Sequence, residues 1–364
     1  ELNSMRSILF LLPQFSGGGA ERVSLNLLIE LYNSGYSVKI IVFNNVGPLK
    51  TMVPSGVLIY SLDSGSLKRS IAPLIGKIRY VQPDVIFSTL GYINIALLSI
   101  RWVLPKKTKI WVREANLPSI SLLNNPNPFL MPILYRLLYK YADRVICTSI
   151  IMRDEFVSDF MVPKKNLNIL PNLIDVQKIR KLAFPVKRFD KGGVCYVASG
   201  RLTFQKGFDL LLNWFVELKD KSSTLVILGG GDLKDELMAK ARLLNMQKQV
   251  KFLGFCNNPW QWYAGADAYL LSSRWEGMPN SALESLACGT PVIATKESGG
   301  IKEVITESGL DNSIIVSTNA QEFIEAMSKV KIKDKNYTSE SLLPGRYRKE
   351  RVINVIKGWL DESK

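Results

Sequence analysis

The feature that most constrains the fold is a regular alternation of short apolar runs with amphipathic segments. The runs are rich in Ile, Val and Phe and have the length of strands, while the segments between them have helical periodicity. Strands that alternate with helices at this spacing predict a parallel sheet with helices on both faces. In the first half we expect strands at 7–12, 38–43, 84–88, 109–112 and 144–148, and helices at 20–33, 71–81, 93–103 and 129–141.

The alternation starts again after residues 185–193, a stretch that mixes Pro, Gly and charge and is typical of a linker. In this second half we expect strands at 194–199, 224–228, 250–253, 268–271 and 291–294, and helices at 208–219, 233–244, 281–288 and 321–329. A chain of 364 residues with 47% hydrophobic and 22% charged residues is globular and long enough for two domains. The expected fold is therefore α/β, with two tandem doubly wound, Rossmann-like domains.

The expected domains are an N-terminal one of residues 5–185 and a C-terminal one of residues 193–345. Residues 346–364 are expected to form a helix that packs back on the N-terminal domain. Its apolar stripe consists of Val352, Ile356, Trp359 and Leu360. In doubly wound sheets, ligands bind outside the carboxyl ends of the strands, so the loops after the strands are where functional residues are expected.

Composition excludes several kinds of chemistry. Histidine is absent, which removes Ser-His-Asp and Cys-His catalysis and His-ligated metals. The four cysteines are far apart among apolar or small residues, which indicates buried thiols in a reducing compartment. No apolar run reaches the ~18 residues of a membrane-spanning helix, and the run at 8–12 is too short for the core of a secretory leader.

The net charge of +15 is concentrated in the first half of the chain. Residues 1–190 carry 24 Lys and Arg against 12 Asp and Glu, whereas residues 191–364 carry 23 against 20. Such a basic half predicts a polyanionic partner, either a nucleic acid or an anionic membrane surface. Charge that serves only solubility is the alternative.

The first candidate site follows the first strand, where residues 13–22 read Pro-Gln-Phe-Ser-Gly-Gly-Gly-Ala-Glu-Arg. Glycines at a strand-to-helix turn let backbone N–H groups approach an anion, and the helix N-terminus adds its positive end. The pattern is neither the dinucleotide fingerprint nor the P-loop. A tight turn without a ligand explains the glycines almost as well.

The second candidate site opens the C-terminal domain. A strand runs into Gly200, and Arg201 and Lys206 follow just past its carboxyl end. Two cations facing the glycine loop of the other domain across a central cleft would bind a diphosphate.

The third candidate site is a Gly/Pro turn that leads into a helix near Asn280. Glu276 lies in the turn and Glu284 about one helical turn inside, so the two carboxylates can accept hydrogen bonds from different hydroxyl groups of one ligand. Free backbone N–H groups near Asn280 and Ser281 suit a phosphate oxygen. A solvated helix residue is the alternative for Glu284.

These three motifs together resemble the retaining, nucleotide-sugar-dependent glycosyltransferases of family 4, which have the two-domain GT-B fold. The family's E-x7-E motif falls on Glu276 and Glu284, and Gly289-Thr-Pro and Gly299-Gly300 follow it. The resemblance implies that Glu276 contacts the transferred sugar and that Glu284 holds the ribose of the nucleotide. It also implies that Arg201 and Lys206 neutralise the departing diphosphate.

The resemblance further implies that the turn at 17–22, with Gly18 and Gly19, closes over the phosphates, and that residues 250–255, ending at Phe255, meet the base. The donor-binding residues implied are Gly18, Gly19, Arg201, Lys206, Phe255, Glu276, Gly277, Met278, Pro279, Asn280, Ser281 and Glu284. The expected reaction is transfer with retention through an oxocarbenium-like state, in which the leaving diphosphate takes the acceptor's proton. Double displacement would instead need a carboxylate nucleophile, which the sequence does not place.

Two features concern catalysis and metals. Many family members carry a histidine near the reacting sugar. Here the corresponding stretch is 112–116, where Glu114 or Asn116 is expected to take over the contact. A structural ion pair of Glu114 with Arg113 or another cation is the alternative. No D-x-D motif occurs in the chain, so we expect no divalent metal and no other cofactor, with Arg201 and Lys206 supplying the positive charge.

The acceptor is expected to be a lipid-linked saccharide, because many members of the family build glycans on polyprenyl-diphosphate carriers. Arg136, Lys140 and Arg144 recur every four residues beside apolar ones, and with Trp102 they predict a surface that docks on anionic lipid. The N-terminal domain is therefore expected to bind the acceptor and face the membrane, and the C-terminal domain to bind the nucleotide sugar. This places the enzyme in the cytoplasm, peripheral on the inner face of the cell membrane. A helix that only covers the sheet is the alternative for residues 129–141.

The donor is expected to be a UDP-linked hexose or N-acetylhexosamine; UDP is favoured over GDP only by its frequency in the family. The alternatives are a nucleotide-sugar epimerase of the same architecture and a transferase with a soluble acceptor. A nucleic-acid-binding protein would leave the E-x7-E pattern without a purpose, so nucleic acid is not an expected partner.

Overall fold

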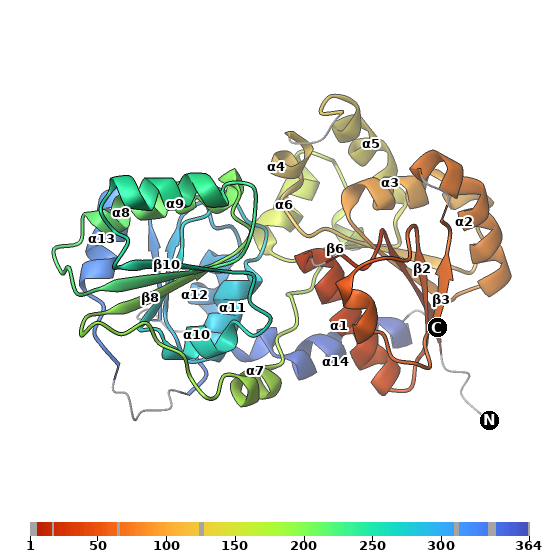
Figure 1. Cartoon of the computed structure of the whole chain (residues 1–364). Helices are drawn as coiled ribbons and strands as arrows, with labels where there is room; N and C mark the ends of the chain where they lie inside the picture. The colour runs from red at the N-terminus through yellow and green to blue at the C-terminus, as the bar shows by residue number, and fades with distance from the viewer. Residues whose placement is uncertain are drawn as a thin grey trace. The chain divides into compact units, whose positions relative to one another are not determined.

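The computed structural model describes residues 6–16, 18–63, 66–123, 127–308, 313–333 and 340–362. They form two compact units (Figure 1). Unit 1 consists of the chain up to Leu173 together with the C-terminal segment that starts at Glu350. Unit 2 contains residues 174–349. Each unit has a parallel sheet with helices on both faces, which confirms the predicted α/β class with two Rossmann-like domains.

The sheet of unit 1 has seven parallel strands in the order β3-β2-β1-β4-β5-β6-β7. The strands are β1 (Ser7–Leu12), β2 (Ser37–Val42), β3 (Leu58–Ser61), β4 (Val85–Thr89), β5 (Lys109–Arg113), β6 (Arg144–Cys147) and β7 (Leu167–Ile169). The helices are α1 (Gly19–Asn33), α2 (Leu67–Val81), α3 (Gly91–Ser99), α4 (Pro118–Leu123), α5 (Leu130–Leu138), α6 (Ile150–Ser158) and α14 (Lys349–Glu362).

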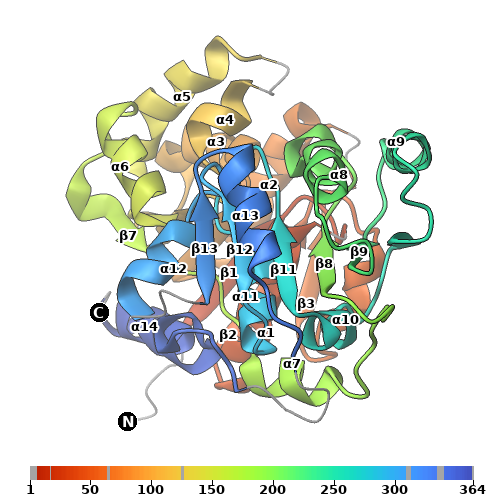
Figure 2. The same cartoon turned by 90° about the vertical axis from the view of Figure 1, so that its left-hand side faces the viewer.

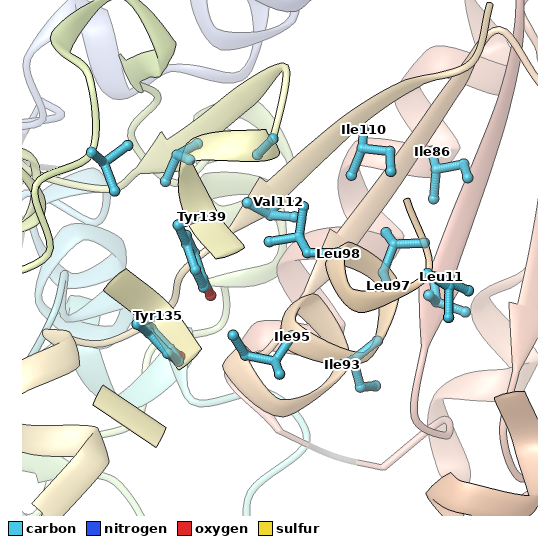
Figure 3. Close-up of a cluster of buried hydrophobic side chains, with 14 of the residues drawn as sticks. Leu11, Ile86, Ile93, Ile95, Leu97, Leu98, Ile110, Val112, Tyr135 and Tyr139 are labelled. Atoms are coloured by element: carbon cyan, nitrogen blue, oxygen red, sulfur yellow. The ribbon is translucent and has the colours of Figure 1, made fainter. Parts of the chain in front are cut away.

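The apolar residues of β1 alternate between two cores because successive strand side chains point to opposite faces. Leu9 and Leu11 join the core under α2, α3, α5 and α6, part of which Figure 3 shows. Ile8, Phe10 and Leu12 join the core under α1 and α14. The members that α14 contributes to this second core are Val352, Ile353, Ile356 and Leu360.

Unit 2 has six parallel strands in the order β10-β9-β8-β11-β12-β13, several of which Figure 2 shows side by side. The strands are β8 (Cys195–Ser199), β9 (Thr224–Leu228), β10 (Val250–Gly254), β11 (Ala268–Leu271), β12 (Val292–Thr295) and β13 (Ile314–Ser317). The helices are α7 (Val176–Leu182), α8 (Phe208–Val216), α9 (Lys234–Leu243), α10 (Trp260–Gly265), α11 (Asn280–Ala287), α12 (Ile301–Ser308) and α13 (Ala320–Ser328). Helices α8, α9 and α13 cover one face, and α7, α10, α11 and α12 the other.

The boundary between the units lies about a dozen residues before the predicted linker. Ile174, Ile179 and Ala183 are buried in the same core as α10 and α11, so α7 belongs to unit 2 and not to the N-terminal domain. The sequence signal was misleading because Pro, Gly and charge mark exposed chain, whether or not that chain crosses between domains. Among the described residues, no helix is long and apolar enough to span a bilayer.

Candidate functional site

The loop after β8 places two predicted cations. Lys206 ends a short 3-10 helix (Phe204–Lys206), and Gly207 then turns the chain into α8 with a positive φ of 63°. A Cβ at Gly207 would lie 2.1 Å from the carbonyl oxygen of Ser272, so only glycine fits this turn. The loop after β8 therefore packs directly on the loop after β11.

Lys206 and Glu276 meet in this packing. The Lys206 ammonium donates a short hydrogen bond to Oε1 of Glu276, although the two residues are 70 positions apart. The Ser273 hydroxyl donates to the same oxygen at 2.8 Å. Only 6% of Glu276 is exposed, so the pair forms a largely desolvated charged centre at the carboxyl ends of β8 and β11.

A second glycine turn holds the Glu276 loop from the other side. Gly299 has a φ of 62°, and a Cβ there would lie 2.1 Å from the carbonyl oxygen of Glu276. The N–H of Gly300 donates to the carbonyl oxygen of Gly277 at 2.8 Å, just before α12 begins. The backbone of the predicted donor loop is thus fixed by the segment that follows β12.

The second glutamate of the motif lies on α11 and has a partner that the sequence did not indicate. The indole N–H of Trp260, on α10, donates to Oε2 of Glu284 at 2.9 Å. At the start of α11, the Tyr269 hydroxyl donates to the Ser281 hydroxyl at 2.7 Å and lies 3.0 Å from that of Ser199. These contacts connect the ends of β8 and β11 to the first turn of α11.

The remaining predicted donor residues of unit 2 differ in exposure. The Arg201 side chain is exposed and forms no hydrogen bond or ion pair with any residue that the structure describes. Phe255, just after β10, is 71% exposed. Met278 is 5% exposed and belongs to the core, so any contact it makes with a ligand would come from its backbone.

Sequence reasoning missed a glycine loop at 229–231, directly after β9. A Cβ at Gly229 would lie 1.9 Å from the Gly200 carbonyl oxygen, and one at Gly231 2.5 Å from the Leu202 carbonyl oxygen. This loop therefore supports the segment that carries Arg201. Three consecutive glycines after a predicted strand were the available signal.

A partly buried ion pair stabilises the same site. The Arg274 guanidinium donates to both carboxylate oxygens of Asp209, at 2.8 and 2.7 Å, and stacks on the Phe204 ring with its centre 3.8 Å away. The hydrogen bond from Arg274 lowers the pKa of Asp209 below its ordinary value. Arg274 thus ties the start of α8 to the loop that carries Glu276.

In unit 1, the predicted glycine turn lies at the start of α1. Gly18 is the N-cap and Gly19 the first residue of the helix, whereas Gly17 lies outside the described residues. Glu21, in the first turn, is only 8% exposed, and the Ser16 hydroxyl donates a hydrogen bond to its Oε1 at 2.6 Å. A Cβ at Gly18 would lie 2.3 Å from Oε2 of Glu21, so glycine at this position leaves room for that carboxylate.

Glu114 lies at the end of β5, inside a network of unit 1. It is 4% exposed, and its Oε1 accepts hydrogen bonds from Asn94 (2.8 Å), Tyr135 (3.3 Å) and, at short range, Tyr139. Burial raises its pKa to about 7, against the lowering effect of these donors. The neighbouring Arg113 donates to Asn172.

The prediction that Arg144 continues a helical stripe with Arg136 and Lys140 is wrong. The helix α5 ends at Leu138, a 3-10 turn follows, and Arg144 begins strand β6, so the four-residue spacing does not continue along one helix. Arg144 pairs with Glu362 at 2.8 Å and stacks on Trp359, which leaves 17% of its side chain exposed. Arg136, Lys140 and Trp102 are exposed as predicted.

Comparison with known proteins agrees with these observations. The family "Glycosyltransferase Family 4" matches residues 17–178, and "Glycosyl transferases group 1" matches residues 180–340. The structure of Anabaena HepE in complex with UDP and glucose superimposes with a TM-score of 0.76 at 19% identity, covering 98% of this chain and all of that one. At that identity the likeness shows the fold.

Two curated relatives are similar over part of their length. An uncharacterized glycosyltransferase of Methanocaldococcus jannaschii is 30% identical over 242 residues, 63% of this chain and 59% of that protein. N-acetylgalactosamine-N,N'-diacetylbacillosaminyl-diphospho-undecaprenol 4-alpha-N-acetylgalactosaminyltransferase of Campylobacter jejuni is 35% identical over 200 residues, 54% of each chain. The matches thus span little more than half of these two proteins.

The two parallel α/β units have the GT-B fold, and the family matches make each half of the chain similar to a glycosyltransferase domain. The first half of the chain is thus similar to the family described as Glycosyltransferase Family 4, and the second half to Glycosyl transferases group 1.

Proposed function

We propose that the protein transfers a hexose or N-acetylhexosamine from a UDP-sugar to a lipid-linked saccharide, with retention at the anomeric carbon. The observation that carries this proposal is the contact between Lys206 and Glu276, which joins two loops at the carboxyl ends of β8 and β11. A cation and a carboxylate at this position suit the two parts of a nucleotide sugar: a charged diphosphate and a neutral ring with hydroxyl groups.

In this proposal, unit 2 binds the donor. Arg201 and Lys206 contact the diphosphate, whose negative charge grows as the glycosidic bond breaks, so they stabilise the transition state more than the bound donor. Glu276 accepts hydrogen bonds from hydroxyl groups of the sugar, and Glu284, oriented by Trp260, accepts those of the ribose. The exposed ring of Phe255 offers a surface for the base.

The choices of UDP and of a lipid-linked acceptor are supported by similar proteins. HepE was crystallised with UDP and glucose, and the name of the Campylobacter relative describes transfer to a saccharide on diphospho-undecaprenol. Retention is proposed because the E-x7-E spacing of Glu276 and Glu284 resembles that of retaining enzymes of the family.

A direct test screens UDP-glucose, UDP-galactose and their N-acetylated forms by calorimetry, and then assays transfer to extracted lipid-linked acceptors. We expect one nucleotide sugar to bind more tightly than the others and its sugar to appear on the acceptor. NMR of the product should show the same anomeric configuration as in the donor. Interconversion of free nucleotide sugars without any transfer would contradict the proposal and favour an epimerase.

We also propose that unit 1 docks on an anionic membrane surface through one face of α5. The residues Phe129, Leu130, Ile133 and Leu137 are between 52% and 88% exposed and form an apolar stripe, whereas Met131 and Tyr135 on the other side of the helix are buried. Large apolar side chains gathered on one exposed face indicate an interaction surface. We refer to these four exposed residues as the α5 apolar stripe.

Basic and aromatic groups accompany the α5 apolar stripe. Arg136 and Lys140 are exposed on the same segment, and the Lys140 ammonium lies 5.2 Å from the centre of the Tyr141 ring. Trp102, 69% exposed, packs edge-on against Tyr141 with ring centres 4.8 Å apart. Apolar residues flanked by cations and by Trp and Tyr suit the interface of an anionic bilayer.

A further inference from the structure

Four hydroxyl groups of unit 2 form a hydrogen-bonded chain at the carboxyl ends of β8 and β11. The Tyr263 hydroxyl, on α10, lies 2.6 Å from the Ser199 hydroxyl, which lies 3.0 Å from the Tyr269 hydroxyl on β11. The Tyr269 hydroxyl in turn lies 2.7 Å from that of Ser281, in the first turn of α11. Tyr263 is 2% exposed and Tyr269 is completely buried, so the chain leads from the core of unit 2 to the start of α11.

The buried end of this chain fixes the direction of its hydrogen bonds. Among the residues that the structure describes, the Tyr263 hydroxyl has Ser199 as its one partner. A buried hydroxyl proton without an acceptor is unfavourable, so Tyr263 donates to Ser199. The Ser199 hydroxyl contacts only the two phenols, and it therefore donates its own single proton to Tyr269.

The Tyr269 proton goes to Ser281. Two acceptors are within its reach, the Ser199 carbonyl oxygen at 3.1 Å and the Ser281 hydroxyl at 2.7 Å. The second distance is the usual one for a hydrogen bond between two hydroxyl groups, whereas the first is long for such a donor. Burial raises the pKa of Tyr269 to about 12, so the phenol keeps this proton throughout the neutral range.

This direction leaves the proton of Ser281 without an acceptor in the protein. The Ser281 hydroxyl accepts from Tyr269 and forms no other hydrogen bond with any residue that the structure describes. It is partly exposed at the second position of α11 (Asn280–Ala287), and the first backbone N–H groups of a helix carry partial positive charge. A hydroxyl proton beside such groups suits an anionic acceptor, and the phosphate oxygen of a nucleotide is one.

We propose that Tyr269 is a positioning residue for the donor diphosphate, because it orients the Ser281 hydroxyl so that the serine proton points to a phosphate oxygen. Tyr269 is buried and acts only through Ser281. Its hydroxyl also accepts from the N–H of Ser199 at 3.3 Å, two residues before Arg201, so one phenol connects both segments assigned to the diphosphate. This inference rests on the proposed function and deepens it, since it adds a residue behind the donor site.

The test compares the whole protein with Tyr269→Phe, Ser281→Ala, the double variant and Ser281→Thr, which keeps a hydroxyl group. The matched control is Tyr196→Phe. Tyr196 is also 2% exposed in unit 2, but its hydroxyl donates to the Met327 carbonyl oxygen, at 2.7 Å. UDP binding is measured by calorimetry, uridine binding by saturation-transfer NMR, and stability by thermal unfolding.

UDP affinity should fall about tenfold or more in Ser281→Ala, because a hydrogen bond to a charged group is lost. It should fall about three- to tenfold in Tyr269→Phe, where the serine proton is no longer directed. The double variant should bind UDP like Ser281→Ala, because Tyr269 acts through that hydroxyl. Ser281→Thr and Tyr196→Phe should bind UDP like the parent, and uridine, which has no phosphate, should bind all the proteins alike.

Parent-like UDP affinity in Tyr269→Phe would overturn the inference, as would losses that add in the double variant or an equal loss of uridine binding. A structural role alone would give these additive and ligand-independent losses. If Tyr269→Phe does not fold, Ser281→Ala decides, since parent-like UDP affinity there would mean that the serine proton does not reach a phosphate. A parent protein that binds neither UDP nor a UDP-sugar would overturn the proposed function itself, and this inference with it.

Discussion

Lys206 and Glu276 form a hydrogen-bonded ion pair between the loops that follow β8 and β11. Their side chains are 17% and 7% exposed, so the pair is shielded from solvent on most sides. Burial of either charge alone would be energetically unfavourable, so each is stabilised by the other. A diphosphate that approaches this loop would compete for the ammonium, and the carboxylate would then be available to the sugar hydroxyl groups.

The Lys206→Ala substitution should therefore reduce turnover strongly. Loss of one donor to a developing charge raises a barrier by about 2.7–4 kcal/mol, so kcat should fall about a hundredfold or more. Steady-state kinetics with the selected UDP-sugar measures this, and Lys248→Ala, an exposed lysine before β10, is the control. A variant that keeps the parent rate would remove Lys206 from the site.

The two glutamates should differ in the ligands they affect. Glu284→Gln should weaken UDP itself, whereas Glu276→Gln should weaken the UDP-sugar with little effect on UDP. Trp260→Phe should weaken UDP by a factor of about 2–10, because it removes one hydrogen bond that orients Glu284. Calorimetric titration of both ligands against the three variants is the measurement, and equal losses of UDP binding in Glu276→Gln and Glu284→Gln would contradict this division of roles.

Transfer should not depend on a divalent metal. The reason is that Arg201 and Lys206 supply positive charge at the proposed diphosphate site, while the sequence contains no D-x-D motif. Excess EDTA should leave the rate essentially unchanged. Inhibition that magnesium reverses would show that a metal ion takes part.

The alternation of strands and helices predicted both sheets, but not every strand in them. β13 (Ile314–Ser317) is a four-residue edge strand, and β7 (Leu167–Ile169) has three residues, so neither has a periodic signal long enough to recognise. The helix predicted at 129–141 ends at Leu138 because the chain tightens into a 3-10 turn at residues 139–141 before β6.

Motifs located the loops of the candidate site, whereas its contacts needed the structure. Glu276 and Lys206 were singled out from their places after strands, but their direct contact depends on how β8 and β11 pair in the sheet. Trp260 could not be connected with Glu284 because 24 residues separate them and no pattern relates the two. Arg144 was wrongly assigned to the same helical face as Arg136 and Lys140. A four-residue spacing places side chains on one face only within a continuous helix, and Arg144 belongs to strand β6.

Glu114 should make the stability of unit 1 fall as pH rises. Its pKa is about 7 in the folded protein, above the ordinary value of 4.5, so folding takes up a proton between these two values. The stabilisation is complete below about pH 4.5 and is lost as pH rises through about 7. Glu114→Gln should remove a slope of up to about 1.4 kcal/mol per pH unit in this window.

Urea unfolding at a series of pH values, followed by circular dichroism, checks this prediction. Glu350→Gln is the control, because Glu350 is exposed on α14 of unit 1 and lies outside the hydrogen-bond network of Glu114. The Glu114 variant should be more stable than the parent at pH 8 and similar to it at pH 4.5. Parallel curves for the parent and Glu114→Gln would mean that the carboxyl group keeps an ordinary pKa.

Binding to vesicles should depend on the α5 apolar stripe and on anionic lipid. Each Lys or Arg near an anionic surface contributes about 1 kcal/mol, and this attraction decays over a Debye length of ~8 Å at physiological salt. Co-sedimentation should therefore require phosphatidylglycerol and fall as salt is raised. Arg136→Gln with Lys140→Gln should weaken binding and reduce its salt dependence.

The combined variant Phe129→Ser, Ile133→Ser and Leu137→Ser should abolish co-sedimentation, because insertion of these side chains adds an apolar term that salt does not screen. Leu243→Ser is the matched control, since Leu243 is 83% exposed on α9 of unit 2. Arg144→Gln should instead lower the thermal stability of unit 1, because it breaks the pair with Glu362 and the contact with Trp359, and leave vesicle binding intact. If the α5 variant sediments like the parent protein, the membrane contact of unit 1 does not involve this helix.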